Sequence, residues 1–294
     1  MINLIIRQIL LSPVQSARFQ PWLERIHLFA LARMNYGLGW TPQLSGEQPF
    51  VRSIVAPLFA QSSSKVAFDV GACAGQYTKL LAKHLPPGSH IFSFEPQISA
   101  YRQLDDLVTR DDLRCVTPFN FGFSNQARTA RLYKHRDGTA LASLYARKLD
   151  RFNILMDLHE EIKLETIDDF CLSRNIDLID LLKLDVEGHE MEVLRGAQRM
   201  LSEGRIRIIQ WEMGGCDIDS RAFLRDFYYL LHDDYIILRL LANGLHPIVT
   251  YKEEYEVFLT TNWCAISRKL LGSEPFRQAL TRFAPLLRKL LRKR

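Results

Sequence analysis

The chain has 294 residues, of which 47% are hydrophobic and 24% are charged, which is enough apolar material for one large soluble domain with terminal additions. Its five cysteines are odd in number, widely spaced and free of any C-x-x-C pair. We therefore expect neither a disulfide framework nor a zinc site, and this cysteine usage is typical of a reducing cytoplasm.

The first residues, MINLIIRQILLSP, are apolar but too few to span a membrane. Arg7 and Gln8 interrupt the run and Pro13 ends it, so we expect no signal peptide. Residues 14–40 then carry apolar side chains at helical spacing. This pattern predicts an N-terminal helix that packs on the rest of the fold.

A strand, a glycine turn and a helix are predicted where residues 66–75 read VAFDVGACAG. Gly71 and Gly75 permit a tight turn whose backbone can approach a ligand closely. The next predicted strand, in the segment HIFSFEP, ends in Glu95, twenty positions after Gly75. A carboxylate there can accept hydrogen bonds from both hydroxyls of a ribose, so the pattern indicates an adenosyl site.

The form of the turn distinguishes two adenosyl cofactors. A dinucleotide fingerprint requires G-x-G-x-x-G, and the middle glycine is absent between Gly71 and Gly75. Asp69, two residues before Gly71, disfavours a diphosphate and suits the cationic sulfonium and ammonium groups of S-adenosylmethionine. The turn therefore favours S-adenosylmethionine, and NAD stays as the alternative.

A second motif, LLKLDVEGHEMEVLRGA, occupies residues 181–197. Together with DVGACAGQY and FEP it closely resembles the FkbM-type methyltransferases, over residues 66–213. The resemblance implies an α/β, Rossmann-like class I methyltransferase fold: a mostly parallel seven-stranded sheet with an antiparallel last strand and helices on both faces. It also implies dependence on S-adenosylmethionine and O-methylation of sugars or other secondary metabolites. Cys73 departs from the family, which usually has asparagine there.

The predicted elements alternate between strands and helices, as a doubly wound sheet requires. We expect strands near residues 66–70, 90–94, 114–119, 181–185, 206–212, 235–240 and 256–266. We expect helices near residues 76–85, 97–109, 166–174, 189–202 and 220–232, with a capping-box-like start at Thr166 and Asp169. The chain then divides into an N-terminal helical extension (1–50), a methyltransferase domain (51–267) and a basic C-terminal tail (268–294).

The candidate site residues follow the carboxyl ends of these strands, where open α/β sheets bind ligands. The predicted cofactor-binding residues are Asp69, Gly71, Ala72, Gly75, Tyr77, Glu95, Pro96, Asn120 and Asp185. His189 is the candidate general base because its ordinary pKa lies near neutrality, and Asp185 is the competing base or the group that orients the acceptor hydroxyl. Glu187, His189 and Glu190 could instead cap the helix that follows Gly188.

Two further predictions concern a metal and a lid. Asp185, Glu187 and Glu212 could converge as oxygen ligands for Mg²⁺, although their spacing does not establish the geometry. Residues 120–164 are longer than a simple crossover and contain aromatic and basic side chains. They predict either a lid over the acceptor or a solvated surface.

The C-terminal tail makes the whole chain basic. Residues 268–294 hold nine Lys and Arg against the single acid Glu274, a net charge of +8, whereas the whole chain carries +5 and the remainder therefore −3. Apolar residues recur at helical spacing opposite the basic ones. Either this helix lies on an anionic membrane surface, or it packs on the domain. Because the body is acidic and contains no recognised nucleic-acid module, we expect no nucleic-acid partner.

The leading functional hypothesis is an S-adenosylmethionine-dependent O-methyltransferase acting on a hydroxyl of a sugar, a polysaccharide or a glycosylated metabolite. A catalytically silent adenosyl-binding protein, recruited to a membrane or partner by its tail, is the alternative from another class. An NAD-dependent oxidoreductase is the third hypothesis. We expect a cytoplasmic protein, with a peripheral location on the inner membrane surface if the tail binds lipid, and we make no prediction of oligomeric state.

Overall fold

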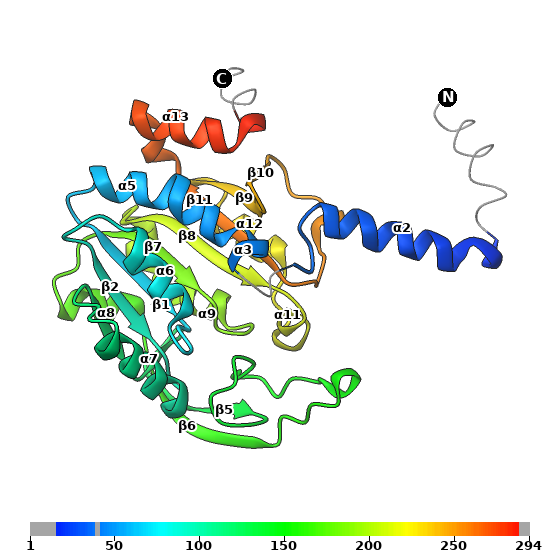
Figure 1. The fold of residues 1–294 in the computed structure, drawn as a ribbon, viewed down its shortest axis with the longest axis horizontal. Coiled ribbons are helices and arrows are strands. Elements are labelled where there is room, and N and C mark those ends of the chain that lie inside the picture. The colour runs from blue at the N-terminus through cyan, green and yellow to red at the C-terminus, as the bar shows by residue number, and fades with distance from the viewer. Residues whose placement is uncertain (1–15, 39–41, 288–294) are drawn as a thin grey trace.

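The computed structural model describes residues 16–38 and 42–287, and a twisted eight-stranded sheet lies at its centre (Figure 1). The spatial order of the strands is β10-β9-β11-β8-β7-β1-β2-β3. The strands are β1 (Val66–Val70), β2 (His90–Phe94), β3 (Val116–Phe119), β7 (Ile179–Leu184), β8 (Ile206–Met213), β9 (Tyr235–Leu241), β10 (Gly244–Ile248) and β11 (Thr261–Ser267). The strands predicted at residues 66–70 and 90–94 are confirmed residue for residue.

The sheet is mostly parallel, as predicted, with one correction to the strand count. β1 pairs in parallel with β2 and β7, and β7 pairs in parallel with β8. β11 lies antiparallel between β8 and β9, which confirms the antiparallel last strand. The sheet has eight strands instead of seven because β10 turns back after β9 and pairs with it at the edge.

Helices cover both faces of the sheet because its strands are apolar on both sides. In β1, Ala67 faces one hydrophobic cluster while Phe68 and Val70 face the other, as the alternation of a strand requires. The first cluster is covered by α4 (Glu47–Phe50), η2 (Val51–Val55), α5 (Ala56–Gln61), α6 (Gln76–His84) and α13 (Glu274–Phe283). The second is covered by α8 (Ile167–Ser173), α9 (Glu190–Arg195), α10 (Gln198–Ser202) and α12 (Leu224–Leu231). α7 (Ile98–Arg110) packs beside β3.

One predicted helix starts where we expected it, and two others differ from their predicted bounds. Thr166 accepts a hydrogen bond from the Asp169 amide at 3.0 Å, so the predicted start of α8 is confirmed. The helix predicted at residues 189–202 divides into α9 and α10 at Gly196, whose carbonyl accepts from the Asp168 amide instead of continuing the helix. The helix predicted at residues 220–232 begins later, as α12. A short helix that was not predicted, α11 (Cys216–Ser220), precedes it and ends at Arg221, whose φ is +59°.

The insertion between β3 and β7 contains a second sheet that the sequence did not predict. Its strands β4 (Gly122–Phe123), β5 (Arg128–Lys134) and β6 (Leu158–Glu165) pair in the order β4-β6-β5. This insertion, residues 120–165, lies at one end of the main sheet, below α9 and α11 in Figure 1. Only three buried apolar residues, Leu132, Ile162 and Leu164, form the hydrophobic cluster between its strands β5 and β6, which explains the weak sequence signal.

The N-terminal helix does not cover the fold, so that prediction is wrong for the described residues. α2 (Gln20–Arg33), preceded by η1 (Ala17–Phe19), projects from the body as a separate rod (Figure 1). Of its residues only Leu31 is buried. The short helix α3 (Pro42–Ser45) then leads back to the sheet.

The C-terminal helix packs on the domain over its described part. After η5 (Arg268–Gly272), α13 buries Phe276 and Leu280, and Ala284 and Leu287 beyond it are buried in the same cluster. These are the apolar side chains that a membrane-bound tail would insert into lipid, so the packing interpretation holds here. Residues 288–294, which carry five of the basic side chains, lie outside the described residues, as does the N-terminal run at 1–15. Within the described ranges, no helix is long and apolar enough to cross a membrane.

Candidate active site

The glycine turn after β1 is pressed against the loop that follows β7. Gly71 and Gly75 have φ angles of +82° and +83°, which favour glycine. A Cβ on Gly71 would lie 1.8 Å from the carbonyl oxygen of Asp185, so no larger residue fits. The Gly71 amide donates to the Phe94 carbonyl at 2.9 Å, which fixes the turn at the carboxyl ends of three adjacent strands.

Glu95 is held at the end of β2 by backbone donors. Its carboxylate accepts hydrogen bonds from the amides of Cys73 and Gln97, both at 2.8 Å. The side chain is buried, and burial raises the pKa of Glu95 to about 7. Asn120 donates from its side chain to the carbonyls of Glu95 and Pro96, at 2.9 and 3.0 Å. Cys73 therefore contributes its amide to this arrangement, and Asn120 fixes the backbone.

A pocket opens between this turn and the insertion. The predicted site residues that line it are Gly71, Glu95, Pro96, Asp185, Glu187 and His189. Its opposite wall is apolar and comes mainly from the insertion, through Leu132, Ala142, Leu144, Ile162 and Leu164. A mostly apolar pocket with a few convergent polar groups is the usual form of a cofactor site.

The other predicted cofactor residues lie outside this pocket lining. Asp69 is buried and accepts a hydrogen bond of 2.6 Å from the Thr78 hydroxyl, and burial raises its pKa to about 6. Tyr77 is also buried and donates to the Gln210 side chain at 2.6 Å. Ala72, Gly75 and Asn120 also lie outside the pocket lining. Glu212, a predicted metal ligand, lies outside it as well. Their contacts support the turn and the sheet.

Four side chains of the insertion hold the loop that follows β7. Ser143 donates to the Glu187 carbonyl at 2.7 Å, and Arg147 forms an ion pair with the Glu187 carboxylate. The Tyr145 hydroxyl lies 3.1 Å from Nδ1 of His189, and the Ser124 hydroxyl lies 3.0 Å from its Nε2. The insertion therefore forms a wall of this pocket, and the hypothesis that it covers the acceptor as a lid stays a prediction.

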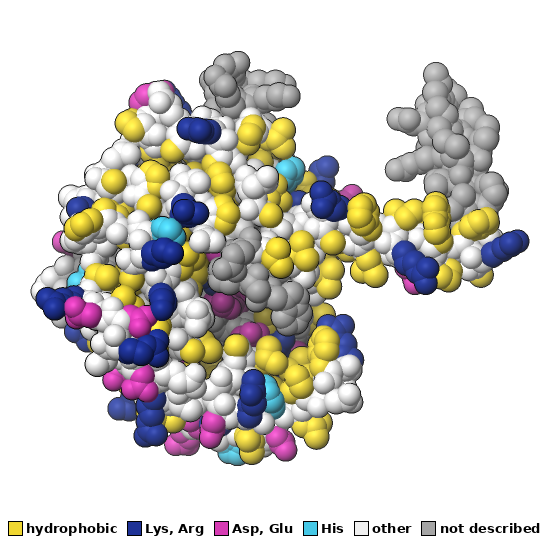
Figure 2. Space-filling model, viewed as in Figure 1, with side chains coloured by type: hydrophobic (Ala, Val, Ile, Leu, Met, Phe, Trp, Pro, Cys, Tyr) yellow, Lys and Arg dark blue, Asp and Glu magenta, His cyan; other side chains and the backbone are white. Residues whose placement is uncertain are grey.

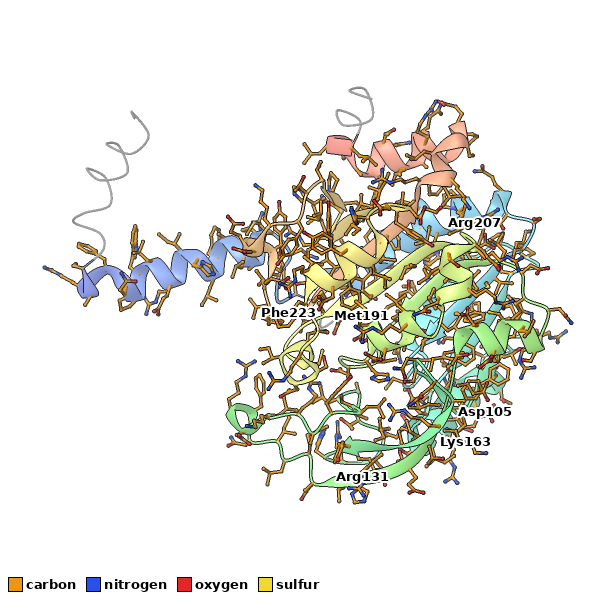
Figure 3. All side chains as sticks on the ribbon, turned by 180° about the vertical axis from the view of Figure 1, so that it is seen from behind. Asp105, Arg131, Lys163, Met191, Arg207 and Phe223 are labelled. Carbon is orange, nitrogen blue, oxygen red and sulfur yellow. The ribbon has the colours of Figure 1, made fainter. Side chains whose placement is uncertain are left out.

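Not every basic residue of the insertion serves the site. Arg131, on β5, lies at the outer edge of the insertion in Figure 3 and is exposed. Arg136 and Lys148 are exposed as well. For these three side chains, the alternative prediction of a solvated surface describes the structure.

Burial shifts the pKa values of Glu187 and His189 in opposite directions, and in both residues it favours the neutral form. Burial raises the pKa of Glu187 to about 7, and the Arg147 cation limits this rise. Burial lowers the pKa of His189 to about 4, so its imidazole is neutral at pH 7. Because both ring nitrogens lie within hydrogen-bond distance of hydroxyl groups of the insertion, His189 connects the insertion to the loop.

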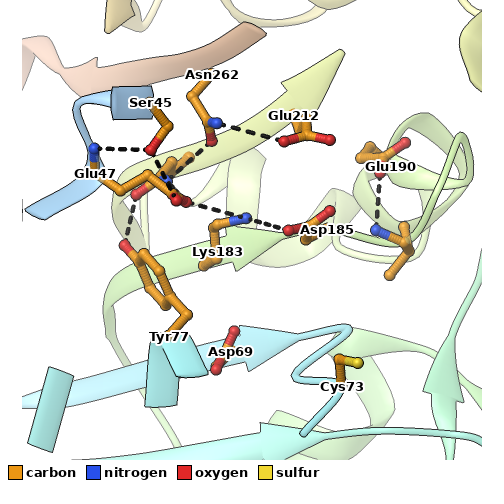
Figure 4. Close-up of polar contacts among 12 residues, drawn as sticks. Ser45, Glu47, Asp69, Cys73, Tyr77, Lys183, Asp185, Glu190, Glu212 and Asn262 are labelled. Carbon is orange, nitrogen blue, oxygen red and sulfur yellow. Dashed lines mark hydrogen bonds and ion pairs between the residues drawn. The ribbon is translucent and has the colours of Figure 1, made fainter. Parts of the chain in front are cut away.

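Asp185 contacts a buried polar network that the sequence did not predict (Figure 4). Lys183 is 1% exposed, and its Nζ lies 3.0 Å from the carboxylate of Asp185 and 3.6 Å from that of Glu47. Gln210 donates to the Glu47 carboxylate at 2.9 Å. Glu47 belongs to α4, so a residue outside the recognised motifs helps to orient Asp185.

The carboxylates proposed as metal ligands each face a different partner. Asp185 meets Lys183, Glu187 meets Arg147, and Glu212 accepts from Asn262 at 3.4 Å. Across residues 16–38 and 42–287, no group of three or more His, Cys, Asp or Glu side chains is placed to hold a metal ion. The Mg²⁺ hypothesis therefore gains no support from this arrangement.

The sequence offered one usable signal for the buried network. Lys183 interrupts the apolar strand LLKLD, and a charged residue in a buried strand requires a buried partner. The identity of that partner could not be read from the chain, because Glu47 is far from Lys183 in sequence. The apolar wall from the insertion gave no comparable signal.

The order of the strands, the antiparallel β11, the glycine turn and the acid at the end of β2 together define the Rossmann-like class I methyltransferase fold. The model of the methyltransferase FkbM domain matches residues 69–231, more than half of the chain. The chain therefore belongs to the FkbM methyltransferase family. A search of curated proteins finds no significant match.

Solved structures of methyltransferases resemble this chain at low identity. One is methyltransferase FkbM from Methylobacillus flagellatus, with 20% identity and a TM-score of 0.44, where the match covers 69% of this chain and 43% of that one. Another is the O-methyltransferase TomG from Streptomyces achromogenes in complex with SAM, with 12% identity, a TM-score of 0.42 and coverage of 76% and 81%. A methyltransferase from Streptococcus mutans in complex with SAH has 10% identity, a TM-score of 0.40 and coverage of 72% and 95%.

Proposed function

We propose that the protein transfers a methyl group from S-adenosylmethionine to a hydroxyl of a sugar, a polysaccharide or a glycosylated metabolite. The observation that carries this proposal is the pocket that joins Gly71, Glu95 and Asp185 at the carboxyl ends of β1, β2 and β7. A glycine turn, a carboxylate for the ribose and a second carboxylate are there directed at one space. Family membership supports the methyl transfer.

The pocket lining fits the parts of S-adenosylmethionine. Glu95 can accept the ribose hydroxyls with the lone pairs that its two backbone donors leave free. The apolar wall around Pro96 and Leu164 suits the adenine ring. Asp185 lines the same pocket and can offer negative charge to the sulfonium and ammonium groups.

The chemistry requires one proton acceptor beside the acceptor hydroxyl. When bound, the cofactor supplies an electrophilic methyl group on a sulfonium sulfur. With the cofactor bound, the carboxylate of Asp185 would accept the proton that the acceptor hydroxyl releases. Asp185 suits this role because its side chain is 39% exposed at the pocket while Lys183 fixes its orientation. His189, the other predicted base, has both ring nitrogens engaged.

The charges around Asp185 favour an acceptor without negative charge. Burial raises the pKa of Glu187 and of Glu212, and the nearby negative charge of Asp185 adds to both rises. The nearest cations, Lys183 and Arg147, are already paired with carboxylates. An acceptor carrying a phosphate or a carboxylate beside the reacting hydroxyl would bring its negative charge next to the Asp185 carboxylate, and no Lys or Arg among the described residues lines the pocket to offset it.

Transfer of a labelled methyl group to a panel of acceptors tests this function. Neutral glycosides should accept the label and their uronic acid or phosphorylated counterparts should not. Asp185→Asn should lower kcat at saturating S-adenosylmethionine by about a hundredfold or more, and it should also weaken S-adenosylhomocysteine binding because the ammonium group loses a charged partner. His189→Gln, the matched control, should stay within about tenfold of the unmodified protein.

Full activity of Asp185→Asn would overturn the assignment of the base. Saturable cofactor binding with no turnover of any acceptor would instead favour the adenosyl-binding recruitment protein. Tight binding of NAD in place of S-adenosylhomocysteine would revive the oxidoreductase hypothesis.

A further inference from the structure

α2 exposes more large apolar side chains than a helix left in water accounts for. Its outward residues include Trp22, Ile26 and Phe29, which are 58%, 45% and 68% exposed. Phe19 and Leu28 are also exposed. Figure 2 shows these apolar side chains along the rod that projects from the body. Contiguous exposed apolar surface of this kind marks a docking site.

The base of the helix is fixed to the sheet. Directly after α2, the Asn35 side chain donates to the carbonyls of Ser45 and Leu240, at 3.0 and 3.2 Å. The Tyr36 hydroxyl accepts from Arg239, whose guanidinium lies 4.3 Å from the centre of the tyrosine ring. Since these groups are buried, the helix projects from a rigid attachment, and its exposed face is a defined feature of the fold.

The three charged residues of α2 lie at different positions around the helix, and Arg33, four residues after Phe29, lies on the same side as the exposed apolar residues, at the base of the helix. Trp22, Ile26 and Phe29 follow at intervals of four and three residues, so they lie on one side of the helix. Glu24, two residues after Trp22, lies on the opposite side. Arg25 directly precedes Ile26 and lies at the edge of the face, from where a long side chain can reach outward.

The distribution of charge favours an anionic partner over a second copy. Residues 1–34 contain Arg7, Arg18, Arg25 and Arg33 against the single acid Glu24, a net charge of +3. Residues 268–294 carry +8, so residues 35–267 carry −6. Two copies joined through α2 would bring like charges together, whereas anionic headgroups attract them.

We propose that α2 docks the protein on an anionic lipid surface. The helix lies in the plane of the headgroups, with Trp22, Ile26 and Phe29 inserted and Arg25 beside the phosphates. Aromatic and aliphatic residues on one face and basic residues at its edge are the composition of interfacial helices. This inference rests on α2 alone and is independent of the proposed methyl transfer.

Sedimentation with vesicles tests the proposal on the full-length protein. Vesicles of phosphatidylcholine with about one third phosphatidylglycerol should bind it, and binding should weaken as salt rises. The triple variant Trp22→Glu, Ile26→Glu, Phe29→Glu should lower the partition coefficient by about a hundredfold or more. All three sites are exposed, so the fold should be kept, as circular dichroism would check.

A second variant separates insertion from the change of net charge. Leu172→Glu, Leu230→Glu and Val249→Glu make the same change of charge at exposed positions on the body, where the residues are 65%, 44% and 61% exposed. This variant should keep vesicle binding within about threefold of the unmodified protein, because α2 is intact. Equal losses in the two variants would overturn the proposal.

The test also distinguishes lipid from a second copy. If another copy covers α2, sedimentation velocity without lipid should show a dimer that the α2 variant dissociates, and vesicles should not bind the unmodified protein. That result would overturn the proposal. A lipid-bound α2 instead predicts that Trp22→Phe removes the fluorescence quenching caused by brominated lipids.

Discussion

Lowering the pH tests the buried environment of His189. Burial lowers the pKa of His189 to about 4 in the folded protein, against an ordinary value of about 6.5 in the unfolded chain. Folding therefore favours the neutral imidazole. Its contribution to stability is fully present above about pH 6.5 and is lost as the pH falls toward 4.

The magnitude follows from these two pKa values. Between about pH 7.5 and about pH 5, the unfolded chain takes up a proton that the folded imidazole does not, and the difference amounts to about 2 kcal/mol. Because His189 is only 4% exposed, little of this is reduced by solvent screening. The raised pKa values of Glu95 and Glu187 act in the opposite direction over the same range, so the total pH dependence does not isolate His189.

Comparison with His189→Gln isolates the histidine. The unfolding free energy of both proteins would be measured in urea across this pH range by tryptophan fluorescence. The unmodified protein should lose about 2 kcal/mol relative to the variant on going from about pH 7.5 to about pH 5. A difference between the two proteins that stays constant within about 0.5 kcal/mol would refute the assigned burial.

Three further substitutions test the packing of the site. Gly71→Ala places a Cβ 1.8 Å from a carbonyl oxygen at a φ of +82°. Its free energy of unfolding in urea should therefore fall by at least about 2 kcal/mol. Wild-type stability would contradict the close approach. Lys183→Met leaves Glu47 buried without its cation, so we expect the free energy of unfolding to fall by about 3 to 5 kcal/mol. Adding Glu47→Gln to the same chain should partly restore it. Additive losses in the double variant would contradict the pairing. Arg147→Met removes the cation beside Glu187, so limited proteolysis should cut the insertion faster, and an unchanged cleavage rate would argue against this docking.

The local parts of the site could be predicted from the sequence. A run of apolar residues before Gly71 and an acid at position 95 are signals within short segments, and both strands were placed to the residue. The resemblance added the antiparallel last strand. These features are local because a turn and its flanking strands determine them.

The contacts across long sequence distances could not be predicted. The pairing of Glu47 with Lys183, and of Arg147 with Glu187, depends on how distant segments pack. β6 has the sequence LHEEIKLE and buries only two apolar side chains, so its pattern resembles a surface segment. α2 has apolar residues at helical spacing, and spacing alone does not show whether a helix packs on the body or projects from it.

Calorimetric titration with S-adenosylhomocysteine tests the central claim most directly. The unmodified protein should bind it saturably at one site, with NAD as the negative control. Glu95→Ala should weaken this binding by about tenfold to a hundredfold, because the ribose loses its charged acceptor. Asp112→Ala, which removes an exposed carboxylate elsewhere, should leave the affinity unchanged. No binding by the unmodified protein, or equal binding by a folded Glu95→Ala variant, would contradict the assignment of this pocket to the cofactor.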